Sequence, residues 1–273
     1  AVTAGQLIKG VDLGDATAYP QIWVVVLVAL VVGTLFGLLN GILITRFEVA
    51  PFIATLGTMY VARGAAMLIT DGETVSILNG QEVFGNTGFP ELFGGRPLGI
   101  PAAIWLMVLL AVVIMIVVNR TPFGRWLYAV GGNIRASELS GVPVKRVNTW
   151  VYMVSGFCAA VAGLVMAAEL NSAPPQLGET YELNAIAAVV IGGAALAGGR
   201  GNVRGALIGA FVIGFLSDGL VLINVSAFWQ MVIKGAVIVL AVILDQAQQR
   251  IERNRSAVLA VENKKTGAPA TAG

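Results

Sequence analysis

The chain has 273 residues, of which 57% are hydrophobic and only 12% are charged, and its formal net charge is +2. An average soluble domain is about 45–50% apolar and about 25% charged. This composition therefore excludes an ordinary soluble domain, a disordered chain and a disulfide-stapled scaffold. The sequence has no histidine and a single cysteine, Cys158, so histidine-based catalysis and an internal disulfide are also excluded. The small net charge gives no reason to expect a nucleic-acid partner.

Seven apolar segments are predicted to form helices in a membrane, because a helix needs about 20 mostly apolar residues to cross a bilayer. In chain order the segments are Ile22–Ile44, Phe52–Thr70, Pro101–Val118, Asn148–Ala168, Asn184–Ala197, Val203–Ile223 and Phe228–Leu244. Asn184–Ala197 has only 14 residues, so a tilted or broken helix inside the protein is its alternative. The pattern predicts an all-α fold, a polytopic transmembrane helix bundle over residues 1–246.

Basic residues are distributed unevenly around these spans. If Arg46 lies in the cytoplasm, alternation of the spans places 13 of the 17 lysines and arginines on that side. Cytoplasmic loops carry such an excess, so we expect residue 1 to lie outside and the C-terminus inside. The basic tail at 247–273 is then cytoplasmic, and we expect it to be partly disordered. The sequence begins with Ala1 rather than Met, so we expect the polypeptide to continue upstream; an outward N-terminus as made is the alternative.

The loop between the third and fourth spans contains the signals of a short helix. Asn133 is a favourable N-cap, Ile134–Ser140 can form the helix, and Gly141 with Pro143 beyond it can end it. A capped helix across the inner face of the membrane could act as a lever on a cytosolic partner. The alternative is a surface loop whose arginines meet anionic lipid.

Glycines recur at four-residue spacing in two places, which predicts close approach of helix backbones. One row is Gly33, Gly37 and Gly41, and the other is Gly201, Gly205 and Gly209. Such rows are common in polytopic membrane proteins, so they indicate a packed bundle and say little about function.

Three charged residues, Arg63, Asp218 and Lys234, lie within predicted spans. A charge at the bilayer centre is costly, so we expect these side chains to line an outward-facing polar vestibule, with Asp218 paired to Arg63 or Lys234. Snorkelling toward outer headgroups is the alternative. Further polar candidates for the translocation pathway are Asn40, Thr55, Thr58, Asn184, Asn224 and Gln230. Amides suit the hydroxyls of a sugar-like solute, although interhelical hydrogen bonds explain such residues as well.

A phosphate-binding motif of the type G-x-x-x-x-G-K-[ST] is missing from the sequence, so we expect no ATP to bind to this chain through a P-loop. The glycine-rich segment Gly198–Gly205 is interpreted as a tight inner turn. We expect no metal or other cofactor in this chain and no catalytic residues. An intramembrane enzyme would need a pair such as Ser/Lys or two aspartates, and a purely structural scaffold is a further alternative.

Several segments together resemble the permease subunit of bacterial ABC importers for monosaccharides, of the ribose, xylose, arabinose and galactoside type. The segments are GRWLYAVGGNIRASELSGVPVKRV at 124–147, YELNAIAAVVIGGAALAGGRGNVRGALIGAFVIGFLSDGL at 181–220, PFIATLGTMYVARG at 51–64, GRPLGIP at 95–101 and FWQMVIKGAVIVLAVILDQ at 228–246. The resemblance implies a multi-pass subunit of the inner membrane that works as a homodimer. It also implies cytosolic ATP-binding subunits that carry ATP and Mg, a periplasmic sugar-binding protein, and further spans upstream of residue 1.

The resemblance further implies that the loop helix docks on the ATP-binding subunit. Its candidate coupling residues are Gly131, Gly132, Asn133, Ala136, Leu139, Ser140, Gly141 and Val142. An ion-coupled secondary sugar carrier, or an ABC permease for a polyol, a nucleoside or an autoinducer, remains the alternative function.

Overall fold

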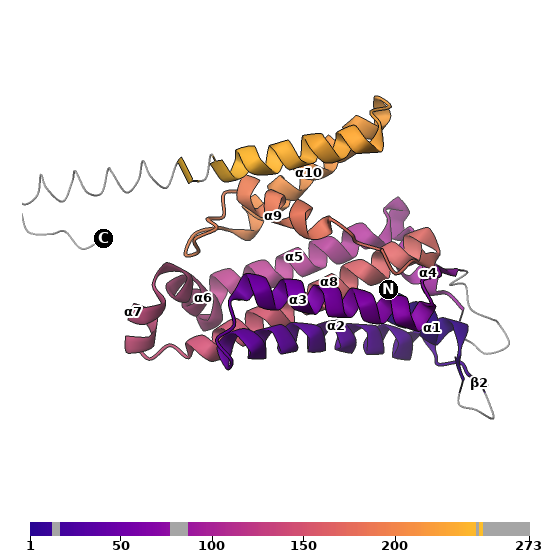
Figure 1. Cartoon of the computed structure of the whole chain (residues 1–273), viewed down its shortest axis with the longest axis horizontal. Helices are drawn as coiled ribbons and strands as arrows, with labels where there is room; N and C mark the ends of the chain where they lie inside the picture. The colour runs from indigo at the N-terminus through magenta and orange to yellow at the C-terminus, as the bar shows by residue number, and fades with distance from the viewer. Residues whose placement is uncertain (13–16, 77–86, 244–245, 248–273) are drawn as a thin grey trace, which may run out of the picture. The chain divides into compact units, whose positions relative to one another are not determined.

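The computed structural model describes residues 1–12, 17–76, 87–243 and 246–247. Contacts divide the chain into two units, unit 1 (Ala1–Glu179) and unit 2, which begins at Thr180. Helices dominate both units (Figure 1), which confirms the all-α fold class. The predicted tail at 247–273 lies outside the described residues apart from Ala247.

Among the residues that the structure describes, five helices are long and apolar enough to cross a membrane. They are α2 (Ile22–Thr45), α3 (Pro51–Thr70), α5 (Ala102–Arg120), α8 (Val144–Leu170) and α10 (Val203–Leu222). Each coincides with a predicted span, because a long apolar run is a signal that needs no tertiary information.

The other two predicted spans form shorter helices. The helix α9 (Tyr181–Ile191) ends before Gly192 and Gly193, and the positive φ of Gly193 (82°) belongs to the turn that follows. A continuous helix over Asn184–Ala197 is therefore not formed, because these glycines end α9 early, and the alternative of a broken helix fits the structure. The last span corresponds to the helix Ala227–Ile243, and Leu244 lies outside the described residues.

Short elements fill the connections. The helices are α1 (Val2–Lys9), α4 (Phe89–Gly94), the 3₁₀ turn η2 (Pro97–Gly99), α6 (Pro122–Gly132) and α7 (Ile134–Leu139), and the two-residue strands are β1 (Val11–Asp12), β2 (Thr17–Ala18), β3 (Val75–Ser76) and β4 (Ser172–Ala173). In the described part of the chain, β1 pairs with β2 and β3 pairs with β4, both antiparallel. The second pair joins the loops that follow α3 and α8, with Val75 opposite Ala173.

Unit 1 is organised around the close antiparallel pair of α2 and α8. A Cβ atom at Gly37 would lie 3.0 Å from the Cα of Met153, and one at Gly41 would lie 2.9 Å from the Cα of Thr149. At Gly33 the neighbour is Ala160, so residue numbers on α8 fall as those on α2 rise. The predicted glycine row is confirmed, and α8 is its partner.

A hydrophobic core covers one end of this pair. The first turns of α2 and the last turns of α8 pack there against α1, α4 and the β3–β4 pair. The rings of Phe89 and Phe93 meet edge to face at this end, with centroids 5.7 Å apart. Helices α6 and α7 lie at the opposite end of unit 1 (Figure 1), where Val130, Val144 and Val147 form a smaller core.

Unit 2 has a similar close contact. The backbone of α10 at Gly205 and Gly209 lies directly against the oxygens of Gly192 and Ala188 at the end of α9. Gly201 precedes α10 and lies beside Ala194 instead. The second predicted row is thus confirmed for two of its three glycines.

Candidate functional site

The first part of the candidate site is the start of α7. Asn133 has an extended backbone (φ −158°, ψ 103°), and its Oδ1 accepts a hydrogen bond of 3.0 Å from the N–H of Ala136. This bond satisfies one of the backbone donors that every helix start leaves unpaired. The prediction that Asn133 caps a helix is therefore confirmed.

The end of α7 is closed by a Schellman motif. Gly141 has a φ of 80°, and its N–H donates to the carbonyl of Glu138 at 3.0 Å. The N–H of Val142 donates to the carbonyl of Ser137, also at 3.0 Å. This pair of bonds around a left-handed glycine is the usual helix stop. Ser140 adds a bond from its Oγ to the Ala136 carbonyl at 2.9 Å.

Packing holds the segments that flank α7, and within α7 Ser137 is buried while the last residue is exposed. Val142 and Phe123 contact the core of Val130, Val144 and Val147, which connects α6 and α7 to the start of α8. The side chain of Leu139 is 83% exposed. All eight candidate coupling residues therefore lie in one short segment that runs from the last turn of α6 through the α7 stop. Its form, a rigid projection with an apolar tip, suits insertion into a groove of another protein.

Among the pathway candidates, the structure brings Asn40 and Thr58 together. The Thr58 hydroxyl donates to Asn40 Oδ1 at 2.7 Å and joins α3 to α2. Thr55 lies one turn earlier on α3, and its hydroxyl bonds to the carbonyl of Pro51 at 2.8 Å. Thr58 is buried and Asn40 half-buried, so this contact first serves helix packing.

Arg63 has a different partner from the one expected. Its Nη1 lies 3.7 Å from Oε1 of Glu179, in the connection that follows β4. Within unit 1 the partner of Arg63 is thus a loop carboxylate, whereas its expected partner Asp218 belongs to unit 2, so the pairing of Asp218 with Arg63 stays a prediction. The arginine is partly buried and Glu179 is exposed, and such pairs contribute little stability. Sequence reasoning missed Glu179 because it compared only charges within spans.

In unit 2 the remaining candidates are dispersed. Asp218 is exposed on α10 and Lys234 is half-buried on the last helix, and no ion pair joins them in the described part of this unit. The Gln230 side chain donates to the Val225 carbonyl at 2.8 Å, which fixes the first turn of its own helix. Asn224 has a left-handed backbone (φ 55°) in the turn after α10. Asn184 is half-buried on α9.

Over residues 1–12, 17–76, 87–243 and 246–247, no group of three or more cysteine, aspartate or glutamate side chains could hold a metal ion.

Known proteins resemble this chain over most of its length. Residues 1–242 match the family model described as "Branched-chain amino acid transport system / permease component". The ribose import permease protein RbsC of Bacillus subtilis is 49% identical over 208 residues, which are 76% of this chain and 63% of that protein. The L-arabinose transport system permease protein AraH of Escherichia coli K12 is 37% identical over 214 residues, 78% of this chain and 63% of that protein. The xylose transport system permease protein XylH of the same organism is 34% identical over 298 residues, 87% of this chain and 76% of that protein.

The chain thus spans 63% of the length of the RbsC protein of Bacillus subtilis. No solved structure matches it. The family model nevertheless covers unit 1 and extends through residue 242 of unit 2, so that it includes the five long helices of the described residues, and the chain belongs to the family of transport-system permease components.

Proposed function

We propose that this chain is the membrane-spanning subunit of an ATP-driven importer that carries a monosaccharide across the bacterial inner membrane. The family description names amino acids, but the three relatives above are named for ribose, L-arabinose and xylose. In this role no bond of the solute changes, so the chain is not an enzyme. ATP and Mg bind to separate cytosolic subunits.

The observation that carries the proposal is the capped helix α7. A helix of only six residues is too short to be stable alone, yet here a side-chain cap, a glycine stop and a valine core all hold it in place. Leu139 at its tip is left without cover in the described residues. These features support a role in which α7 inserts into a cytosolic ATP-binding subunit and passes motion to the spans.

The charge distribution supports the orientation that this role needs. Arg46, Lys145 and Arg146 lie at the ends of α2 and α8 next to α7. Since cytoplasmic segments are enriched in lysine and arginine, we place α7 and the C-terminus in the cytoplasm. A second copy of the permease and a periplasmic sugar-binding protein complete the assembly.

In the proposed cycle, ATP binding and hydrolysis on the partner chains move α7 and change which side of the bundle is open. The polar candidates of the spans contact the sugar only in passing, so a deep, tight site is not required. They are Asn40, Thr55, Thr58, Arg63, Asn184, Asp218, Asn224, Gln230 and Lys234.

The proposal is tested on the complex that a tagged full-length chain retains when it is purified from cells with its partners. Leu139→Asp replaces the exposed tip of α7 with a charge. We expect this variant to lose the ATP-binding subunit and sugar uptake while its amount in the membrane is unchanged. Leu98→Asp is the matched control, because Leu98 is also a leucine in a connection and is 88% exposed. The control should retain the ATP-binding subunit. Retention by the Leu139 variant would refute the docking role of α7.

Uptake of radiolabelled solutes identifies the cargo and the energy source. We expect ribose, arabinose or xylose to accumulate in an ATP-dependent way. Accumulation of leucine alone would instead support the branched-chain amino acid transport that the family description names. Uptake that survives ATP depletion and stops with an uncoupler would show an ion-coupled carrier and refute the proposal.

A further inference from the structure

A hollow lies at the α7 end of unit 1, between the end of α2 and the start of α8. Its volume is about 490 Å³. The lining residues are Ile42, Thr45, Arg46, Lys145, Arg146, Thr149 and Trp150. The hollow thus combines three cations with an aliphatic and an aromatic side chain, and nothing in the proposed transport role uses it.

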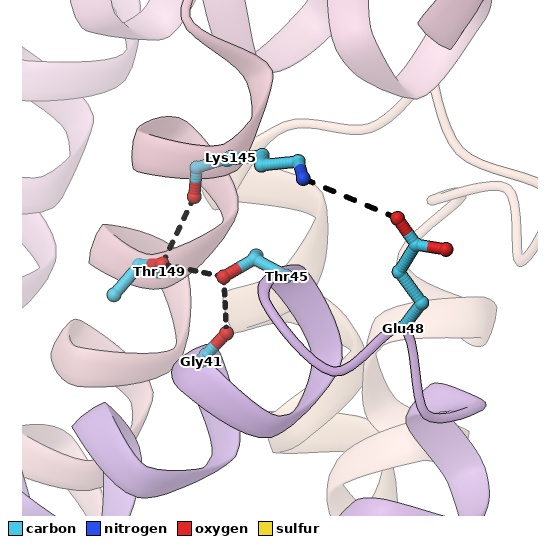
Figure 2. Close-up of polar contacts among 5 residues, drawn as sticks. All are labelled: Gly41, Thr45, Glu48, Lys145 and Thr149. Atoms are coloured by element: carbon cyan, nitrogen blue, oxygen red, sulfur yellow. Dashed lines mark hydrogen bonds and ion pairs between the residues drawn. The ribbon is translucent and has the colours of Figure 1, made fainter.

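Hydrogen bonds fix the position of its wall (Figure 2). The hydroxyls of Thr45 and Thr149 lie 3.2 Å apart and join the two helices. Each hydroxyl also lies within hydrogen-bond distance of a carbonyl of its own helix, Thr45 of Gly41 at 2.7 Å and Thr149 of Lys145 at 2.9 Å. Because each hydroxyl has one proton, two of these three contacts are hydrogen bonds at any one time. Because the Gly41 contact brings the helix backbones together at the same place, the cations of both helices are held near one another.

Among the described residues, the ion pairs neutralise only part of the positive charge of the hollow. The Oε1 of Glu48 lies 4.0 Å from the Nζ of Lys145, one of the three cations (Figure 2). The Lys145 and Glu48 side chains are 69% and 81% exposed, and an exposed pair at this distance is weak. One carboxylate beside Arg46, Lys145 and Arg146 leaves two positive charges in excess.

The apolar part of the hollow continues along the spans. Trp150 is 56% exposed and Ile42 is also exposed. Leu39 lies on the same face of α2 as Ile42, and Val154 on the same face of α8 as Trp150, each about one turn farther from the basic end. Both side chains are exposed. A basic cluster with a tryptophan at the end of two apolar helices is typical of the membrane interface.

We propose that this hollow binds an anionic phospholipid. The phosphate lies among Arg46, Lys145 and Arg146, and an acyl chain lies along the exposed face of Ile42 and Trp150. A free phosphate ion would leave the apolar side of the hollow unused, and an acidic protein segment would not extend to Leu39 and Val154. The proposal requires only that α2 and α8 cross a membrane, so it stands apart from the transported solute and from the docking of α7.

The test is native mass spectrometry of the purified full-length chain in detergent with equal amounts of phosphatidylglycerol and phosphatidylcholine of the same acyl chains. We expect the chain to retain phosphatidylglycerol in preference. A basic residue near a membrane surface contributes about 1 kcal/mol to the binding of anionic lipid, or about fivefold. The triple variant Arg46→Gln, Lys145→Gln, Arg146→Gln should therefore lose the preference by at least about tenfold.

The matched control removes three other exposed arginines, Arg120, Arg125 and Arg204, also to glutamine. It should keep the preference of the unmodified chain, since these residues do not line the hollow. If the triple variant does not elute as a folded protein, Arg46→Gln and Arg146→Gln are measured singly, each with an expected loss of about fivefold.

Three results would overturn the proposal. Equal retention of the two lipids by the unmodified chain, or an equal loss in the control, would show that the hollow has no lipid preference. Displacement of phosphatidylglycerol by excess inorganic phosphate would show a site for the phosphate group alone. A triple variant that keeps the lipid but loses its co-purified ATP-binding subunit would assign the cations to a protein partner.

Discussion

Replacing Gly37 with alanine is expected to destabilise unit 1, although alanine is the better helix former. A Cβ at this position would overlap the carbonyl oxygen of Tyr152 and lie 3.0 Å from the Cα of Met153. Both are backbone atoms, so no side-chain rotation relieves the overlap and α8 must move away. Overpacking of this kind costs about 1–3 kcal/mol, whereas removal of a helical glycine returns at most about 1 kcal/mol. The expected net loss is about 1 kcal/mol.

The comparison with Gly57→Ala isolates the packing effect. Gly57 lies within α3, and a Cβ there meets no atom of the described structure within 4 Å. That variant gains the propensity term without the overlap and should be as stable as the unmodified chain or slightly more stable. The measurement is the apparent melting temperature in detergent, where about 1 kcal/mol corresponds to roughly 2–4 °C for a chain of this size. If Gly37→Ala melts at or above the temperature of Gly57→Ala, the close α2–α8 contact is not present in solution.

Three further outcomes are expected. Gly209→Ala should lower the melting temperature because its Cβ would overlap the Ala188 oxygen, while Gly214→Ala on the same helix, which meets no described atom within 4 Å, should not. Thr58→Val should lower the free energy of unfolding by about 0.6–1.7 kcal/mol, because it loses the 2.7 Å hydrogen bond to Asn40. Thr58→Ser keeps a hydroxyl and should retain the stability of the unmodified chain in the same melting assay. Equal melting temperatures of the two variants would contradict the role of the hydroxyl. Asn133→Ala should destabilise α7 by about 1 kcal/mol, because the helix loses its N-cap, and should retain less of the ATP-binding subunit. Asn133→Asp can still accept the capping hydrogen bond and should retain the subunit. Equal retention by the two variants would contradict the capping argument.

The parts of the structure that follow from local signals were predictable from the sequence. Asn133 and Gly141 lie a few residues from the helix that they delimit, so the conformation of α7 follows from known capping preferences. The long spans follow from runs of apolar residues in the same way. The conformation of the coupling segment was predicted correctly for this reason, while its function remains a proposal.

The parts that depend on distant partners were not predictable. The glycine row of α2 indicated a close helix contact, but nothing local identifies α8 as the neighbour. The β3–β4 pair joins Val75 to Ala173, and each strand has only two residues. The contact of Arg63 with Glu179 was not predicted for the same reason, since Glu179 comes near Arg63 only through the folding of a connection. Helix α1 was not predicted either, because it is short and forms part of a tertiary core.

The close contact of α2 with α8 limits how unit 1 can change shape. If one helix slid along the other, Gly33, Gly37 and Gly41 would no longer face the backbone atoms of α8 that they now contact. Residues with side chains would take their places against α8, so we expect the two helices to move together as one rigid pair. An opening beside this pair must therefore form at a helix that packs less closely against its neighbours. Helix α5 fits that description, because none of its 19 residues is buried in the described structure.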